Sequence, residues 1–194
     1  MVVLIKDFHS AKQRLSPALD PAARAALARR NAALALEAAA VGPHVLAVAG
    51  SPEAADMARR EGVEVLLEAV PGGQNGASRS GIEQILRNGA EAVLLMSSDL
   101  PLVTPAAVRD LLEHAATLGE RAVLAAPAVG RGGTNALYLR PPDVIGLHFG
   151  DDSLGKFERD AAGRGVAFAL HESEELALDL DEPEDLRSLA GLGR

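Results

Sequence analysis

Short apolar segments alternate with longer, partly polar segments along the 194-residue chain. Strands that are apolar throughout and separated by helices are typical of a mostly parallel sheet covered on both faces. The pattern therefore predicts one α/β domain over residues 1–194. The apolar segments predict strands at 2–5, 44–50, 63–67, 92–96, 122–126, 135–139 and 166–170. The longer segments predict helices over 21–40, 52–61, 77–88, 105–118 and 153–162, and from residue 183 onward.

The net charge and the amino-acid composition exclude several classes of function. The net charge of −8 and the pI near 5.1 argue against broad binding to nucleic acid or to an anionic membrane surface. With no cysteine there is no thiolate ligand or cysteine nucleophile, and the five histidines show no HExxH spacing. No apolar run approaches the length of a membrane span, and the apolar start is too short for a signal peptide, so we expect a cytoplasmic protein.

Candidate ligand-binding residues follow the predicted strands, where open α/β sheets bind their ligands. The loop KDFHSAKQRLSP at 6–17 carries Lys6, Lys12 and Arg14, which suit a phosphate-bearing ligand. It contains neither a P-loop motif nor GxGxxG. From these residues alone, a solvated basic loop is an equally good interpretation.

The segment PGGQNGAS at 71–78 follows the third predicted strand. Its glycines, including Gly73, allow the backbone to approach a ligand closely. The side-chain amides of Gln74 and Asn75 can pair with a nucleobase edge or a ribose. Taken by itself, the segment favours the simpler interpretation of a flexible turn before the next helix.

Acidic residues form a second kind of candidate. Asp99, in SSDLP, lies directly beyond the fourth predicted strand, where a carboxylate can hold Mg²⁺. The alternative, that Asp99 caps the following turn, is weakened because Thr104 already serves as a helix cap. Asp179 and Asp181 alternate in LDLDEPEDL, so on an extended segment both face the same way. Paired acids repel one another unless they are solvated or bind a cation.

Two further motifs suit an anion. In GRGGTNAL, glycines around Arg131 precede Thr134 and can form an anion-binding nest, with a hairpin turn as the alternative. In HFGDDSLGK, Gly150 and Ser153 precede a predicted helix whose N-terminus can receive a carboxylate or phosphate.

Together the motifs K…AKxRL, SDLP, GGTNAL, FGxxS and DxDxPEDL resemble the CofC/FbiD enzymes. These are the guanylyltransferases of coenzyme F420 biosynthesis, within the MobA-like nucleotidyltransferase superfamily. The resemblance runs from Lys6 to Leu186, and its most specific parts are RGGTNAL and FGxDS. It implies a Rossmann-like three-layer α/β/α sandwich of the nucleotide-diphospho-sugar transferase type, with about seven strands in a mostly parallel mixed sheet.

The resemblance also implies a reaction. GTP would donate GMP to a small phosphorylated carboxylic acid, either 2-phospho-L-lactate or phosphoenolpyruvate, with Mg²⁺ as cofactor. The implied catalytic residues are Lys12, Arg14, Asp99 and Asp181. Further implied contacts are Lys6, Lys12, Arg14, Gly73 and Asn75 for GTP, Asp99, Asp179 and Asp181 for the metal, and Thr134, Gly150 and Ser153 for the acceptor.

Some positions depart from the usual family pattern and keep alternatives open. Asp7-Phe8-His9 and Gln74 leave the base preference undecided, and Glu182 stands where Thr is common. The alternatives are a MobA-like or CTP-dependent transferase with another acceptor, and a non-catalytic nucleotide sensor. The first loop lacks the glycines expected of the molybdenum-cofactor enzyme. The two candidate acceptors share every charged group, so the sequence favours neither, and the alanine-rich helix is compatible with a homodimer.

Overall fold

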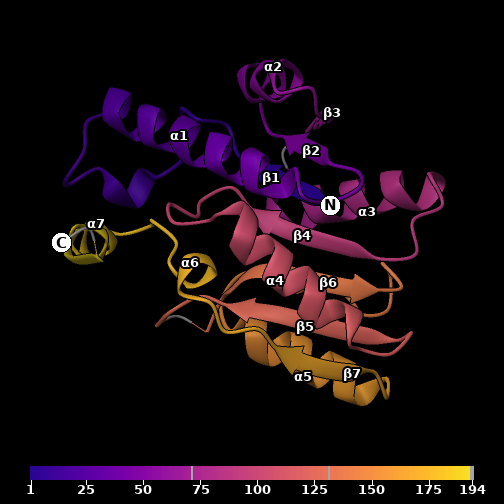
Figure 1. The fold of residues 1–194 in the computed structure, drawn as a ribbon. Coiled ribbons are helices and arrows are strands. Elements are labelled where there is room, and N and C mark those ends of the chain that lie inside the picture. The colour runs from indigo at the N-terminus through magenta and orange to yellow at the C-terminus, as the bar shows by residue number, and fades with distance from the viewer. Residues whose placement is uncertain (71, 131, 193–194) are drawn as a thin grey trace.

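One seven-stranded sheet organises the protein (Figure 1). The computed structural model describes residues 1–70, 72–130 and 132–192, so Pro71 and Arg131 of the predicted loops lie outside the described residues. The strand order is β3-β2-β1-β4-β6-β5-β7, and only β6 runs antiparallel to its neighbours. This confirms the predicted mixed, mostly parallel sheet. The strands are β1 (Val2–Ile5), β2 (Leu46–Ala49), β3 (Glu64–Leu67), β4 (Val93–Ser97), β5 (Ala122–Pro127), β6 (Thr134–Arg140) and β7 (Ala167–Leu170).

Helices cover both faces of the sheet, as the three-layer prediction requires. Helices α1, α2 and α4 pack on one face, and α3 and α5 on the other (Figure 1). None of the described helices is long and apolar enough to cross a lipid bilayer. The helices are η1 (Gln13–Leu15), α1 (Pro21–Ala39), α2 (Pro52–Arg60), α3 (Gly73–Arg87), α4 (Pro105–Ala116), α5 (Ser153–Gly163), α6 (Glu174–Ala177) and α7 (Pro183–Leu192).

Small residues bring the helices close to the sheet. The core on the α1 face is built largely from alanine, including Ala28, Ala32 and Ala35 along one side of α1. On the other face, a Cβ atom added to Gly81 of α3 would lie 2.7 Å from Val2 Cγ1, closer than real atoms approach. Helix α3 therefore lies directly against β1, and the glycine makes this approach possible.

Helix α3 begins at Gly73, four residues before the predicted start at Ala77. Glycine has low helix propensity, so the sequence of this turn indicated a loop. Packing of Ala77 and Ile82 against the sheet stabilises the helix instead. The consequence is that Gly73 and Asn75 lie in the first turn of a helix. The short η1 and α6 were not predicted, because three or four residues carry no periodic pattern.

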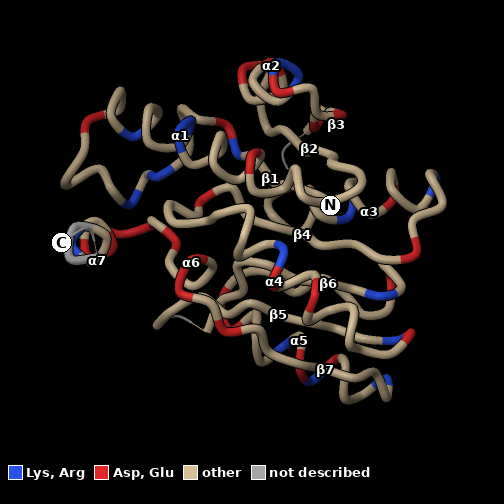
Figure 2. Tube along the Cα trace, viewed as in Figure 1, with Lys and Arg blue, Asp and Glu red and all other residues tan. Residues whose placement is uncertain are grey.

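The antiparallel strand β6 brings the GGTNAL motif to the edge of the sheet where β1 and β4 end, which we call the binding edge. Parallel β1 and β4 end at one edge of the sheet, and β6 starts there because it runs the other way. Thr134, the first residue of β6, therefore lies near the end of β4. The chain between α6 and α7 reaches the same edge, where Leu180 N–H donates to Asp99 O over 3.3 Å. This connecting chain is acidic (Figure 2).

The loop before α5 is held by one carboxylate. Asp160 Oδ2 accepts a hydrogen bond from Gly146 N–H (2.7 Å) and lies 2.8 Å from His148 Nε2, while Oδ1 accepts from Arg164 Nε. Burial opposes ionisation of Asp160, but these three contacts outweigh burial and lower its pKa to about 2. The ionised carboxylate therefore fixes the chain immediately before Phe149 and Gly150.

We expect Asp160→Asn to lower the free energy of unfolding at pH 7 by about 1–3 kcal/mol, because the donors on Gly146, His148 and Arg164 lose a charged acceptor. A carboxyl group whose folded pKa lies below its unfolded value near 4 adds stability above about pH 4 and loses it as the pH falls toward 2. Denaturant unfolding between pH 7 and 2 should therefore show a shallower acid loss in the variant. The control is Asp56→Asn, which breaks only an exposed pair with Arg59. Equal acid profiles for wild type and Asp160→Asn would contradict this role.

Candidate functional site

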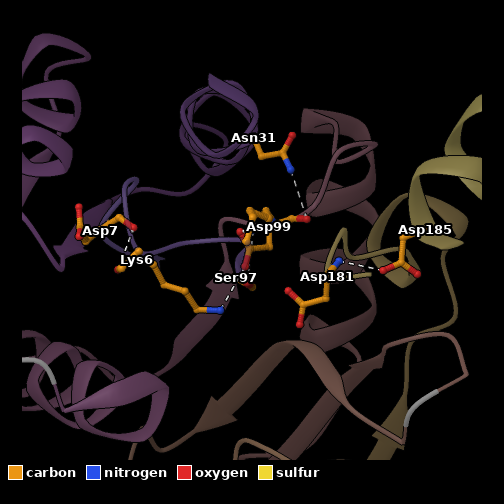
Figure 3. Close-up of polar contacts among 9 residues, drawn as sticks. Lys6, Asp7, Asn31, Ser97, Asp99, Asp181 and Asp185 are labelled. Atoms are coloured by element: carbon orange, nitrogen blue, oxygen red, sulfur yellow. Dashed lines mark hydrogen bonds and ion pairs between the residues drawn. The ribbon is translucent and has the colours of Figure 1, made fainter. Parts of the chain in front are cut away.

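A buried carboxylate lies at the centre of the binding edge. Asp99 follows β4, with Oδ1 2.8 Å from Lys12 Nζ and Oδ2 3.2 Å from Lys6 Nζ (Figure 3 shows the Lys6 contact). Burial opposes the charged form of Asp99, but Lys12 and Lys6 outweigh it and hold its pKa below the usual value. In return the Asp99 carboxylate raises the pKa of Lys6. Asp99 and Lys6 are therefore both charged at neutral pH.

The backbone of Asp99 joins three parts of the fold. Its carbonyl accepts hydrogen bonds from Asn31 Nδ2 of α1 (3.5 Å) and from Leu180 N–H (3.3 Å). Its own N–H donates to Ser97 Oγ over 3.3 Å. Asn31 was not predicted as a site residue. Its signal in the sequence is a polar residue on the buried, alanine-rich side of α1.

Lys12 supports Asp99 from inside the protein. Its backbone has φ 60°, a left-handed conformation that is unfavourable for a residue with a side chain. The Lys12 side chain is 0% exposed, and its ammonium makes the ion pair with Asp99 but no hydrogen bond of regular geometry among the described residues. A buried ammonium of this kind holds the carboxylate in its charged form.

Asp181 faces the same space as Lys6. The Asp185 carboxylate fixes its backbone by accepting from Asp181 N–H (2.8 Å) and Glu182 N–H (2.7 Å). The Asp181 side chain then points toward the end of Lys6 (Figure 3), and the charges of Asp181 and Asp179 add to the rise in the pKa of Lys6. Asp185 thus has a structural role, as expected for an acid at a helix start.

The acids at this edge do not by themselves complete the coordination of a metal ion. Among the described residues, no group of three or more His, Cys, Asp or Glu side chains could hold a metal ion. Asp99 and Asp181 supply two hard carboxylates, and Mg²⁺ commonly takes one or two carboxylates together with phosphate oxygens of a substrate. The residues therefore fit Mg²⁺ only when a phosphate ligand completes its coordination.

Two adjoining cavities open at this edge. One, of about 210 Å³, is polar, and the other, of about 260 Å³, contains Leu4, Val48 and Ala77 in its wall. Lys6, Gln74 and Ser97 line both cavities. The two cavities are therefore neighbours, and together they offer an apolar compartment and a charged one.

The structure brings most of the predicted residues together. Among the described residues, Gly73 lines the apolar cavity, while Lys12 and Asn75 line neither. Ser97 and Phe149 also line the polar cavity and were not predicted, and Gln74, whose amide was considered for a nucleobase or ribose, lines it too. The predicted residues in the wall of the polar cavity are Lys6, Arg14, Asp99, Thr134, Gly150, Ser153, Asp179 and Asp181.

The wall contributed by β6 and α5 presents hydroxyl groups. Ser153 Oγ lies 3.1 Å from Thr134 Oγ1, and both residues are buried. Gly150 has φ 121°, a conformation that residues with side chains rarely adopt, so glycine is required for this turn. Two hydroxyls and a tight backbone turn are suited to bind an oxyanion.

Arg14 also lines the polar cavity, and its Nη1 lies 3.7 Å from Glu182 Oε1. Both side chains are largely exposed, and such surface pairs contribute little stability. A phosphate ligand can therefore compete with Glu182 for the Arg14 guanidinium at small cost.

The chain is similar to known proteins over nearly its whole length. Residues 1–193 match the family model described as "Guanylyl transferase CofC like". The chain is 40% identical over 195 residues to the phosphoenolpyruvate guanylyltransferase of Rubrobacter xylanophilus, covering 99% of this chain and 93% of that one. It is 35% identical over 191 residues to the 2-phospho-L-lactate guanylyltransferase of Methanothermobacter thermautotrophicus, covering 95% and 81%.

The fold is similar to that of a solved protein from Desulfovibrio desulfuricans described as a nucleotide-diphospho-sugar transferase. The TM-score is 0.80 at 17% identity, with 100% of this chain and 86% of that chain covered. This likeness supports the predicted fold type, and the family match confirms the resemblance seen in the motifs. The chain belongs to the CofC-like guanylyltransferase family of nucleotidyltransferases.

Proposed function

We propose that the chain transfers GMP from GTP to a phosphorylated three-carbon acid, with release of pyrophosphate, in the biosynthesis of coenzyme F420. The observation that carries the proposal is the pair of neighbouring cavities, one apolar and one lined by Lys6, Asp99 and Asp181. A nucleotide needs both compartments, one for its base and one for its phosphates. The relatives act, by name, on phosphoenolpyruvate and 2-phospho-L-lactate, which share a phosphate and a carboxylate.

The reaction needs no protein nucleophile. A phosphate oxygen of the acceptor is already ionised near neutral pH, and it attacks the α-phosphorus of GTP in line. The new phosphorus–oxygen bond forms while the bond to the bridging oxygen of the β-phosphate breaks, and pyrophosphate leaves with that electron pair. The protein therefore contributes positioning and charge stabilisation.

The cavity residues divide these tasks. The apolar cavity would take the guanine base, and Gly73 would let the backbone approach it. Lys6 and Arg14 would stabilise the triphosphate and the departing pyrophosphate. Thr134, Gly150 and Ser153 would bind the acceptor. Lys12 would act through Asp99 by keeping that carboxylate ionised.

Asp99 and Asp181 would hold Mg²⁺, with Asp179 beside them. When bound, the ion neutralises negative charge on the phosphate oxygens and orients the two substrates. Because these acids leave coordination positions for a ligand, we expect tight metal binding only with nucleotide present.

The first test is an acceptor panel. We expect mass spectrometry to find a guanylylated product, and an assay to find pyrophosphate, when the protein is incubated with GTP, Mg²⁺ and either 2-phospho-L-lactate or phosphoenolpyruvate. The panel includes 3-phosphoglycerate, and unphosphorylated lactate as a control that lacks the attacking group. CTP and ATP are tested in parallel as donors. Nucleotide binding without product from any acceptor would contradict the proposal and favour the nucleotide sensor.

The second test concerns the metal carboxylates. We expect Asp181→Asn to lower kcat by about 100-fold or more, because one preorganised charge at the phosphates is lost. The melting temperature should change little, since the structure holds the Asp181 segment through its backbone N–H. Asp143→Asn is the matched control on an exposed loop away from both cavities. A kcat for Asp181→Asn within about twofold of wild type would remove Asp181 from the catalytic set.

A further inference from the structure

Asn75 makes a reciprocal pair of hydrogen bonds with the backbone of Phe149. Its Nδ2 donates to Phe149 O over 2.9 Å, and Phe149 N–H donates to Asn75 Oδ1 over 2.8 Å. The two residues are 74 positions apart in the sequence. One side chain thus joins the first turn of α3 to the loop that precedes α5.

The pair lies between the two compartments of the site. Gly73, Gln74 and Ala77, on either side of Asn75, line the apolar cavity, and Phe149 and Gly150 line the polar cavity. Among these described residues only Gln74 lines both cavities, and Asn75 lines neither. Because the Asn75 amide is hydrogen-bonded to Phe149, Asn75 supports residues of both cavity walls without lining either cavity.

The position of Phe149 is set from two sides. Its ring packs edge-on against Phe157 of α5, with ring centroids 5.2 Å apart. Its N–H and C=O both pair with Asn75. The next residue, Gly150, has φ 121°, a conformation that residues with a side chain rarely adopt. Without Asn75, the backbone of Phe149 would lose both of these hydrogen bonds, although the Asp160 carboxylate would still hold Gly146 and His148.

We propose that Asn75 is a positioning residue that couples the nucleotide-binding turn 72–77 to the acceptor-binding loop 149–153, and that Gln74 is the amide facing the ligand. The inference rests on the proposed function. Nucleotide seated on the turn orders the acceptor loop through this pair, and acceptor in turn strengthens nucleotide binding, as linkage requires. The coupling also favours productive binding of both substrates together.

Kinetics distinguish positioning from base recognition. We expect Asn75→Ala and Asn75→Asp to raise the KM for the acceptor by about tenfold, since each hydrogen bond contributes roughly a factor of two to ten. Asn75→Asp keeps an oxygen for Phe149 N–H but cannot donate to Phe149 O, so it tests the loss of that one hydrogen bond. The ratio of kcat/KM for GTP to that for ATP should stay unchanged.

Asn88→Ala and Asn88→Asp are the matched controls, because they make the same changes at the other end of α3. Their kinetics should equal those of wild type. A changed ratio of kcat/KM for GTP to that for ATP, with a normal KM for the acceptor, would overturn the proposal. Asn75 would then contact the nucleotide base and contribute to base specificity. Asn75 variants that behave like the Asn88 variants would overturn it as well.

Hydrogen exchange tests the coupling without relying on turnover. We expect the Phe149 amide to exchange about tenfold faster in Asn75→Ala than in wild type and Asn88→Ala. GTP should slow exchange of segment 146–153 in wild type and not in Asn75→Ala. Equal protection of this segment in all proteins would overturn the proposal. If no acceptor supports turnover, the proposed function is wrong. Hydrogen exchange of segment 146–153, measured with and without GTP, then still tests the coupling between the two segments.

Discussion

The charge of Asp99, held between Lys6 and Lys12, is the interaction on which the site depends. A buried carboxylate is costly unless it is paired, and removing one partner of such a pair costs about 3–5 kcal/mol. Lys12 provides the buried partner and adopts a left-handed backbone conformation to reach it. The Asp99 backbone then joins β4 to α1 and to the C-terminal segment. One residue thus stabilises the binding edge and presents charge to it.

The surrounding residues form two groups. One group holds other site residues in place, and the other lines the cavity where a ligand would bind. Lys12 and Asn75 lie behind the walls, where they fix Asp99 and Phe149. Lys6, Arg14 and Gln74 lie in the walls themselves. Support of this kind matters because phosphoryl chemistry of the proposed sort relies on placement and charge. Small errors in position therefore reduce the rate even when every contacting residue is present.

The sequence predicts the layers and the edge that binds ligands, because apolar strands and helix caps are local signals. Comparison with a family adds the pairing of Asp99 with Asp181, which local patterns cannot join across the chain. The early start of α3 is missed, because tertiary packing overrides the low helix propensity of its glycines. The burial of Lys12 and the partner of Asn75 are missed for a related reason. A side chain's exposure and its remote backbone contacts arise only once the sheet has assembled.

The most direct measurement compares Asp99→Asn with the double variant Lys12→Met/Asp99→Asn, in thermal unfolding and in single-turnover GMP transfer. The account predicts that Asp99→Asn loses stability because Lys12 is left as an unpaired buried charge, and that the double variant regains much of it. It also predicts that transfer stays at least about 100-fold slower than wild type in both. Near-normal transfer in either folded variant would contradict the account.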